Sequence, residues 1–307
     1  MPTLFFWIVV FIASLLALVK ASNLFIESAE RIGAWLGFSS FVIGTTIVAI
    51  GTSLPELASS LAAVFADSSE IVVGDVIGSN IANITLILGL AMLARRRITI
   101  IHPFLGGDIF FLIISAVLLG ITIINGSFSR AEGLFFVILL GLYLYYLKRR
   151  ESFKAEEKES PKARTILAFT ASLILIYLGA KYTIKSVIEI SSLTGIGVEV
   201  IAASAIALGT SLPELTVSLA AVIRGKTEIS VGDLVGSNIF NTFGVMGIPA
   251  MFSNLIVPES MLSFGLPLML IVTFLVALIL LRRELHMLEG FLLIGIYIFF
   301  IGKLYFG

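Results

Sequence analysis

The stretch Ile47–Val64 reads IVAIGTSLPELASSLAAV, and Glu70–Ile84 follows it as EIVVGDVIGSNIANI. The same pattern returns at Ala205–Val222 as AIALGTSLPELTVSLAAV and at Glu228–Thr242 as EISVGDLVGSNIFNT. The copies are 158 residues apart, and 24 of the 42 positions aligned between residues 43–84 and 201–242 are identical without a gap. A period of this length indicates a duplicated half-protein rather than a solenoid repeat.

The composition is that of a membrane protein. Hydrophobic residues make up 58% of the 307 residues, charged residues only 13%, and the mean hydropathy is +1.10. A soluble domain carries about 25% charged residues. The chain has no cysteine, which excludes disulfides and thiolate metal sites. We therefore expect the lipid bilayer as its environment, and the absence of a basic patch argues against a nucleic-acid partner.

Ten apolar segments are long enough to cross a bilayer, which takes about 20 residues each. The polar stretch KRRESFKAEEKESPKAR at 148–164 divides them into two sets of five. We expect an all-α integral membrane fold with a first five-helix repeat at 1–147, a linker at 148–164 and a second five-helix repeat at 165–307. The expected spans are 4–25, 39–65, 71–94, 104–124, 131–147, 165–185, 197–223, 229–252, 263–281 and 287–305.

The distribution of Lys and Arg predicts the orientation. If the N-terminus lies outside, sixteen of the 20 Lys and Arg residues fall in inside loops and four fall outside. The positive-inside rule then places both termini outside and the linker in the cytoplasm of a multi-pass cell-membrane protein. Because each half has five spans, the halves run in opposite directions. Ten transmembrane helices in two inverted five-helix repeats are a common transporter plan.

Each copy of the repeat places a glutamate, Glu56 or Glu214, in the middle of an apolar span. An ionised carboxylate at the bilayer centre costs about 2.5–3.5 kcal/mol on insertion scales, so we expect it to face a cavity or bind a cation. Pro55 and Pro213 lack an N–H and should kink their helices, which frees carbonyl oxygens in the preceding turn. Prolines and hydroxyls that serve helix packing alone are the structural alternative, which the recurrence of the whole motif disfavours.

Hydroxyls and amides of both copies complete the expected site. Ser79 and Asn83 lie one helical turn apart, as do Ser237 and Asn241, so each pair shares a helix face. An all-oxygen site without imidazole or thiolate suits a hard cation, and six to eight oxygens is the Ca²⁺ preference. The expected ligands are the carboxylates of Glu56 and Glu214, the amides of Asn83 and Asn241, and the hydroxyls of Thr52, Ser53, Ser79, Thr210, Ser211 and Ser237.

Other recurring polar residues have simpler interpretations. Asn80 and Asn238 point away from the shared face, and we expect them to join helices by hydrogen bonds. Asp75 and Asp233 each follow a glycine near the start of a span. For these two aspartates we expect an N-cap or interfacial role rather than ion binding.

GTSLPE followed by G-D-x-x-GSN-x-x-N, present twice, resembles the alpha repeats of the calcium/cation antiporter superfamily, which includes Na⁺/Ca²⁺ and Ca²⁺/H⁺ exchangers. The resemblance implies a secondary-active antiporter, not an enzyme, that transports Ca²⁺ in exchange for H⁺ or Na⁺ by alternating access. It implies Glu56 and Glu214 as central ligands and adds the backbone carbonyls of Ala49 and Ala207. It also implies that the first and sixth spans slide against the rest.

The expected counter-ion depends on the charge at Asn83 and Asn241. In many Na⁺/Ca²⁺ exchangers one of these positions is an aspartate, whereas both are neutral here. Two protons on two carboxylates balance one Ca²⁺, so we expect Ca²⁺/H⁺ exchange, with a Na⁺/Ca²⁺ exchanger of the same fold as the alternative. A cation channel is a further alternative, although channels usually build pores from symmetric subunits or short filter loops. An intramembrane aspartyl protease is disfavoured, because inverted topology puts Asp75 and Asp233 near opposite membrane faces.

Overall fold

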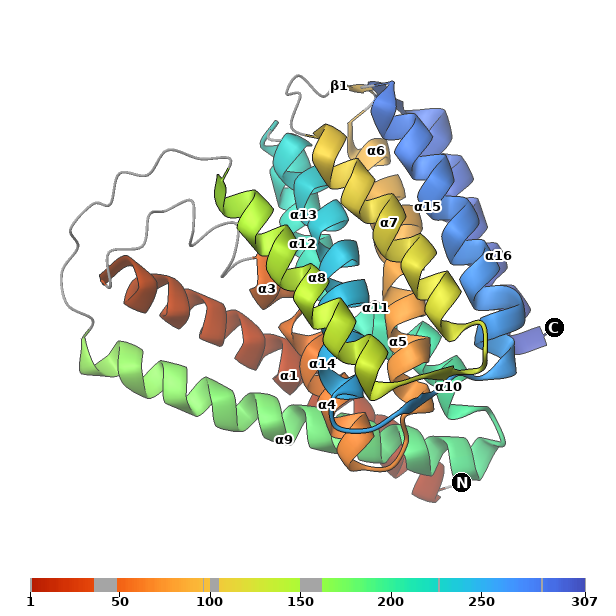
Figure 1. Cartoon of the computed structure of the whole chain (residues 1–307). Helices are drawn as coiled ribbons and strands as arrows, with labels where there is room; N and C mark the ends of the chain where they lie inside the picture. Colours follow the sequence, from red (N-terminus) through yellow and green to blue (C-terminus); the bar gives the residue numbers. More distant parts are fainter. Residues whose placement is uncertain are drawn as a thin grey trace.

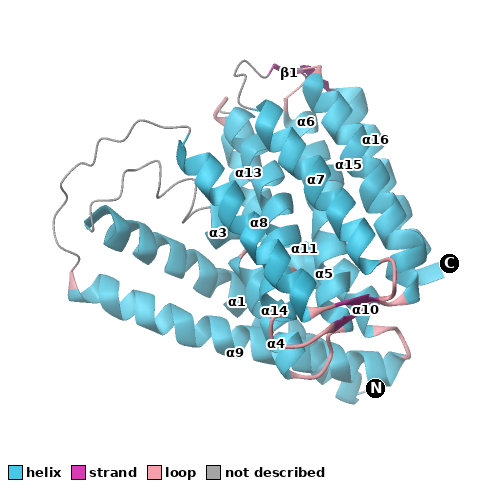
Figure 2. Cartoon of the chain, in the orientation of Figure 1, coloured by secondary structure: helices cyan, strands magenta, loops and turns pink. Residues whose placement is uncertain are grey.

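The computed structural model describes residues 2–35, 49–95, 97–99, 105–149, 162–225, 227–282 and 284–306. These residues form a bundle of helices with a short two-stranded antiparallel sheet at each of two opposite ends (Figure 1 and Figure 2). Most of the expected linker, 150–161, and the expected start of the second span, 39–48, lie outside the described residues.

Two long helices lie side by side and are tilted against the rest of the bundle (Figure 1). They are α1 (Pro2–Trp35) and α9 (Ala163–Thr194). Both extend well beyond the ends predicted from hydropathy. The other helices of the first half are α3 (Ala49–Thr52), α4 (Leu54–Phe65), α5 (Glu70–Ile81), α6 (Leu88–Ala94), α7 (Leu105–Ile123) and α8 (Arg130–Arg149). Those of the second half are α10 (Val198–Ile201), α11 (Ala207–Thr210), α12 (Leu212–Ile223), α13 (Thr227–Phe240), α14 (Gly247–Ala250), α15 (Leu266–Leu281) and α16 (Met287–Phe306).

Segments of π-helix interrupt several spans where an α-helix was expected. The segments are Ala82–Ile87, Ala202–Ile206, Asn241–Val245 and Met261–Gly265. The first and third are equivalent in the two halves. Ala82–Ile87 contains Asn83, and Asn241–Val245 begins at Asn241. π-Helical turns are rare, and those that occur are often at functional sites. Their recurrence therefore marks Asn83 and Asn241 as candidate functional residues.

The element bounds repeat at the offset seen in the sequence. Helices α3 and α4 map onto α11 and α12 without any shift at 158 residues. The four strands, which the sequence did not predict, follow the same rule: β1 (Arg97–Thr99) maps onto β3 (Leu255–Ile256), and β2 (Ser127–Phe128) onto β4 (Glu284–His286). Strand β1 pairs with β4, and β2 pairs with β3, so each sheet joins the two halves. Equivalent sheets at opposite ends of the bundle are what an inverted repeat produces.

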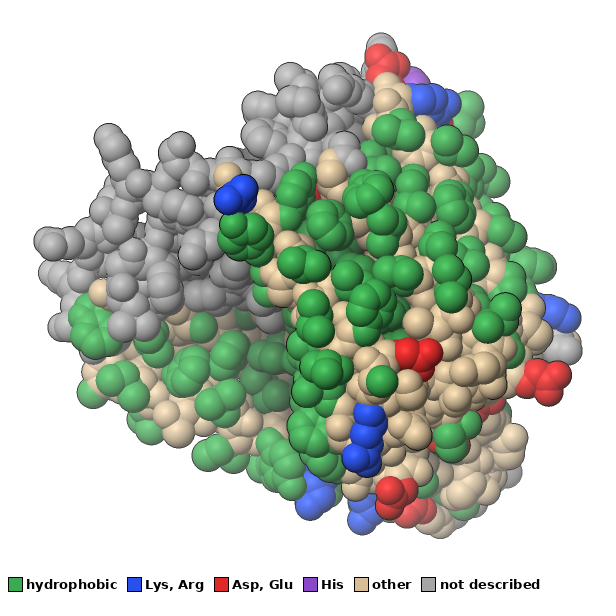
Figure 3. All heavy atoms as spheres, viewed as in Figure 1, with side chains coloured by type: hydrophobic (Ala, Val, Ile, Leu, Met, Phe, Trp, Pro, Cys, Tyr) green, Lys and Arg blue, Asp and Glu red, His purple; other side chains and the backbone are tan. Residues whose placement is uncertain are grey.

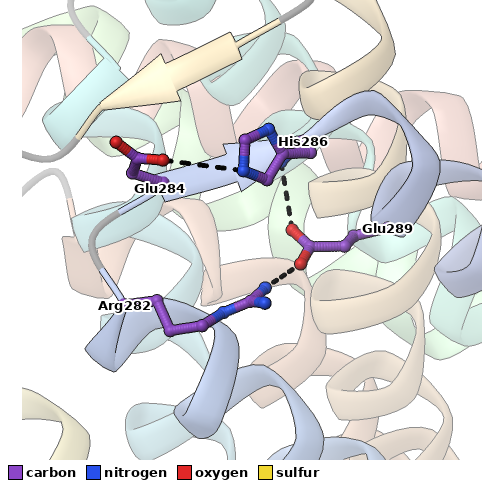
Figure 4. A network of polar contacts seen from close by, with 4 residues as sticks. All are labelled: Arg282, Glu284, His286 and Glu289. Atoms are coloured by element: carbon purple, nitrogen blue, oxygen red, sulfur yellow. Dashed lines mark hydrogen bonds and ion pairs between the residues drawn. The ribbon is translucent and has the colours of Figure 1, made fainter.

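Polar contacts strengthen the β1–β4 end of the bundle (Figure 4). Arg282 at the end of α15 forms an ion pair with Glu289 in the first turn of α16. The other carboxylate oxygen of Glu289 accepts a hydrogen bond from the His286 backbone N–H at 3.0 Å, as in a capping box. The His286 ring lies 3.7 Å from Glu284. This end of the helix pair α15–α16 is therefore fixed by both charge and capping.

The outer surface fits a bilayer. Six described helices are long and apolar enough to cross a membrane, and a seventh counts if the bent pair Val198–Thr210 and Leu212–Ile223 is one span. Hydrophobic side chains cover the middle of the visible face, and most charged side chains lie toward its two ends (Figure 3). The all-α membrane fold predicted from the sequence is confirmed, and the remaining expected spans are short or broken among the described residues.

Glycines let α5 pack closely in the interior. A Cβ at Gly74 would lie 3.1 Å from the Glu199 Cα, and a Cβ at Gly78 would lie 2.6 Å from the Ala203 Cα. Small residues allow such close backbone approach between membrane helices. Helix α5 therefore lies directly against Val198–Ile206, the segment that leads into the second GTSLPE motif.

Candidate cation site

Both GTSLPE motifs break their helices as the prolines predict. Helix α3 ends at Thr52 and α4 begins at Leu54, so Ser53 forms the break, and Ser211 does the same between α11 and α12. Ser53 has φ −89° and ψ 15°, and Ser211 has φ −80° and ψ 10°. The bent pair that contains the second break changes direction by 44°. The kinks expected at Pro55 and Pro213 are therefore present.

The two glutamates are bound by serines of the opposite half. Ser53 donates a hydrogen bond to Glu214 Oε1 at 3.0 Å, and Ser211 donates one to Glu56 Oε1 at 3.1 Å. Ser237 lies 3.5 Å from the same Glu214 oxygen, and Thr52 is a further donor to Glu214. All of these side chains are at most 2% exposed. The site is therefore built across the interface between the halves, and among the described residues Glu214 has more hydroxyl donors than Glu56.

Several buried polar atoms at this interface have no partner among the described residues. They are Oε2 of Glu56 and of Glu214, together with the side-chain oxygen and nitrogen of both Asn83 and Asn241. A buried polar atom without a hydrogen bond costs about 1–3 kcal/mol, so a group of them calls for a bound ion or water. Two carboxylate oxygens and two amide oxygens match the donor set that a hard cation prefers.

The remaining predicted ligands are placed differently. The Thr210 hydroxyl donates to the Ile206 and Ala207 carbonyls, at 3.0 and 3.4 Å, rather than to a glutamate. The Ala207 carbonyl also accepts the Ser211 N–H at 3.1 Å, so the kink does not free it. Ala49 is the first described residue of α3. The role of each of these residues as a ligand stays a prediction.

The other asparagine of each motif joins the two halves, as expected. Asn80 donates to the Thr242 hydroxyl at 3.0 Å, and Asn238 donates to the Asn80 backbone carbonyl at 3.1 Å. Both side chains are buried. These bonds connect α5 to α13 and to the π-helical segment that starts at Asn241, so they hold the two GSN motifs against each other.

The N-cap role expected for Asp75 and Asp233 was wrong. The N-cap of α5 is Ser69, and Asp75 lies inside the helix with a fully buried side chain. Asp75 accepts hydrogen bonds from Ser59 at 3.2 Å and from Ser79 at 3.5 Å. Asp233 likewise lies inside α13 and accepts one from Ser218 at 3.4 Å. Helix α5 begins at Glu70, only one residue before the predicted span start, so the prediction failed because the first turns of this helix are buried by other helices.

The negative charges interact across the site. When ionised, Glu56 and Glu214 repel each other, and both repel an ionised Asp75. Among the described residues, no three side chains of the types His, Cys, Asp and Glu are grouped as ligands for one metal ion. A cation bound by the two glutamates would therefore depend on hydroxyls and amides for the rest of its coordination, while reducing the repulsion between the carboxylates.

Comparisons with known proteins identify the family. The family described as sodium/calcium exchanger protein matches twice, over residues 6–148 and 164–306. The chain is 34% identical to the sodium/calcium exchanger MaX1 of Methanosarcina acetivorans, over 97% of this chain and 98% of that protein. It is 31% identical to the inner membrane protein YrbG of Escherichia coli, over 89% and 88% of the two chains.

A solved structure of the sodium-calcium exchanger NCX_Mj has the same fold. Its TM-score to this chain is 0.70 at 30% sequence identity, with 96% of this chain and 97% of that chain covered. The likeness extends over both halves, as does the family match. The chain therefore belongs to the sodium/calcium exchanger protein family, as a membrane antiporter that exchanges Ca²⁺ for cations rather than an enzyme.

Proposed function

We propose that this chain exchanges Ca²⁺ for Na⁺ at a single site between its two halves. The observation that carries the proposal is the crosswise pair Glu56 and Glu214, each held at Oε1 by a serine of the other half and each with a buried, unpartnered Oε2. The names of MaX1 and NCX_Mj, which match nearly the whole chain, support Na⁺ as the counter-ion.

The proposed ligands follow from this geometry and from the resemblance. The carboxylates supply charge, and the amides and hydroxyls supply neutral oxygens for either Ca²⁺ or several Na⁺ ions. Because both ions use the same oxygens, occupancy by one excludes the other, which is what exchange requires. The proposed set comprises Glu56, Glu214, Asn83, Asn241, Thr52, Ser53, Ser79, Thr210, Ser211, Ser237 and the carbonyls of Ala49 and Ala207.

The folded structure weakens the argument, made from the sequence, that two protons on two carboxylates balance one Ca²⁺. That argument counted two carboxylates, but Asp75 is also buried and close enough to repel both glutamates. With a third buried carboxyl beside the site, a count of Glu56 and Glu214 alone no longer fixes how many monovalent ions replace one Ca²⁺. Asn241 stays neutral, and this observation keeps Ca²⁺/H⁺ exchange as the second candidate function.

The arrangement in the membrane is part of the proposal. We place both termini outside and the 148–164 linker in the cytoplasm, on the strength of the Lys and Arg distribution. The chain ends, marked in Figure 1, lie toward the opposite end of the bundle from β1, which fits termini on one side and the β1–β4 sheet on the other. The halves 1–147 and 165–307 are the proposed repeats.

Ca²⁺ uptake into proteoliposomes tests the function. We expect an outward Na⁺ gradient at clamped pH to drive uptake, and a pH gradient without Na⁺ to drive none. Uptake driven by the pH gradient alone would establish the proton candidate instead. Glu56→Gln and Glu214→Gln should abolish uptake, whereas Glu259→Gln, the same change at an exposed glutamate, is the matched control.

A further inference from the structure

Two arginines at the β1–β4 end of the bundle have no acidic partner among the described residues. Arg95 follows α6 directly and Arg224 follows α12, each at the C-cap position of its helix, and both side chains are exposed. The ion pairs of the described residues include neither of them, whereas Arg282 at the same end is paired with Glu289. The charges of Arg95 and Arg224 are therefore available to a ligand.

The two arginines lie close together although they belong to different halves of the chain. Helices α6 and α12 pack against each other. A Cβ at Gly225, the residue after Arg224, would lie 3.2 Å from Arg95 Nη1, so the Arg95 guanidinium lies against the turn that carries Arg224. Further positive charge follows in the sequence at Arg96, Arg97 and Lys226. Like charges placed together repel each other, and a bound anion would remove that repulsion.

The arginine pair marks the place where two apolar segments end. The membrane-capable segment Glu70–Ala94 ends one residue before Arg95, and Leu212–Ile223 ends one residue before Arg224. Ile223 is 76% exposed. Exposed apolar side chains followed directly by basic residues are typical of the boundary between the hydrocarbon core and the lipid headgroups. At this boundary an anion is most directly supplied by a lipid headgroup.

The opposite end of the bundle has the same turn with different charges. At the offset of 158 residues, Arg224–Lys226 corresponds to Ala66–Ser68, and Arg95 corresponds to Ser253. Gly225 has φ 78° and its equivalent, Asp67, has φ 54°, so both turns use a left-handed backbone. The β2–β3 end therefore carries a carboxylate and no arginine at these positions, and it provides an internal comparison.

Stabilisation of a helix end is the simpler role of an arginine at a C-cap, because a cation there interacts favourably with the helix dipole. Helix α4, the equivalent of α12, has Ala66 at its C-cap and no basic residue in its last turn. The fold therefore completes this helix end without an arginine. The dipole of α12 also does not explain why a second arginine, Arg95, reaches the same turn from the other half.

We propose that Arg95 and Arg224 together bind the phosphate of an anionic phospholipid in the leaflet at the β1–β4 end, with its acyl chains along Ile223. Guanidinium groups are permanently charged, and their planar donors suit bidentate contact with phosphate. Gly225 leaves the turn free of the carboxylate that Asp67 supplies at the other end. The inference concerns lipid binding and does not depend on which ion the chain exchanges.

Lipid binding to the purified full-length chain tests the inference, by native mass spectrometry with phosphatidylglycerol titrated and phosphatidylcholine as the neutral control. We expect phosphatidylglycerol to bind more tightly, and Arg95→Gln and Arg224→Gln should each weaken its binding about fivefold, the effect of one basic residue near a membrane surface. Arg282→Gln, at an exposed but ion-paired arginine of the same end, should change this binding by less than about twofold. Equal binding of both lipids, or equal loss in all three variants, would overturn the inference.

Two substitutions at Gly225 separate charge from backbone structure. Gly225→Asp introduces at this turn the carboxylate that Asp67 carries at the other end, and it should abolish the preference for phosphatidylglycerol because the carboxylate pairs with Arg95. Gly225→Asn has nearly the same shape and the same tolerance for a left-handed backbone, and it should keep the preference. Equal effects of the two substitutions would contradict the proposal, because the packing of the turn would then matter rather than its charge.

Thermal unfolding in nanodiscs separates lipid binding from stabilisation of α12. The wild type should be more stable with phosphatidylglycerol than with phosphatidylcholine. The double variant Arg95→Gln, Arg224→Gln should lose that gain and unfold like the wild type in phosphatidylcholine. An equal loss of stability in both lipids would identify the arginines as helix caps and refute lipid binding. Equal protection of the wild type by inorganic phosphate at the concentration of the lipid would assign the pair to a soluble anion, which also refutes the proposal.

Discussion

Replacing Gly78 by alanine should disturb both stability and ion binding. A Cβ at this position would lie 2.6 Å from the Cα and 2.7 Å from the carbonyl carbon of Ala203, whereas ordinary van der Waals contact begins at 3.4 Å. Both partners are backbone atoms, so the clash cannot be relieved by a side-chain rotation. The nearest atom is the Ala203 carbonyl oxygen at 2.3 Å, so helix α5 and the π-helical segment Ala202–Ile206 must separate by about 1.1 Å, the difference between 2.3 and 3.4 Å.

The expected cost follows from this displacement. Overpacking a well-packed interior typically costs about 1–3 kcal/mol, and we expect the free energy of unfolding to fall by that amount. Ser79 follows Gly78 directly, and functional sites are held to within about 0.5 Å. We therefore expect Ca²⁺ affinity to fall by about tenfold or more, equivalent to about 1.4 kcal/mol.

Thermal unfolding in detergent and calorimetric Ca²⁺ binding measure the two effects. Gly295→Ala is the control, because Gly295 lies within α16 and no described residue is within 4 Å of its added Cβ. That substitution should be neutral or stabilising by about 0.5–1 kcal/mol, as for any exposed helix glycine. A Gly78→Ala protein with wild-type stability and Ca²⁺ affinity would refute the claim that α5 packs directly on Ala203.

Three further predictions use single substitutions. Glu56→Gln and Glu214→Gln should each abolish Ca²⁺ exchange while the protein still inserts, as measured by flux in proteoliposomes and by membrane fractionation; near-normal flux would remove that glutamate from the site. Asn80→Ala should lower the free energy of unfolding by about 1–3 kcal/mol, because Thr242 loses its buried partner; unchanged thermal unfolding would show that the bond does not stabilise the interface. Ser160→Cys, in a chain without native cysteine, should be protected from an impermeant thiol reagent in intact cells; labelling there would reverse the predicted topology.

Most of what the sequence predicted about the fold came from the internal repeat. A shared motif at one offset predicted a duplication, and the midspan position of Glu56 and Glu214 predicted that they would be buried together. The inversion of the halves, inferred from five spans in each, stays a prediction. The kinks followed from Pro55 and Pro213 because the loss of an N–H acts locally, whatever the surrounding structure. The burial of the glutamates and the helix breaks are confirmed, because each depends on a property of the residue itself or on the duplication.

Other features depend on contacts that no local pattern encodes. The short strands arise where loops of opposite halves meet, and their residues carry no alternating pattern of their own. The π-helical turns at Asn83 and Asn241 likewise have no sequence signature. Asp75 was misplaced because a polar residue near the end of a hydropathy window is usually interfacial, whereas α5 continues past it with both faces buried.

The crosswise bonds Ser53–Glu214 and Ser211–Glu56 constrain how a chain of this kind can arise. A half-length ancestor would possess both the serine and the glutamate, yet it could not join them within one copy. It would obtain the bonds only by associating with a second copy inserted upside down. Under the proposed inverted topology, association of two oppositely inserted copies would precede gene fusion.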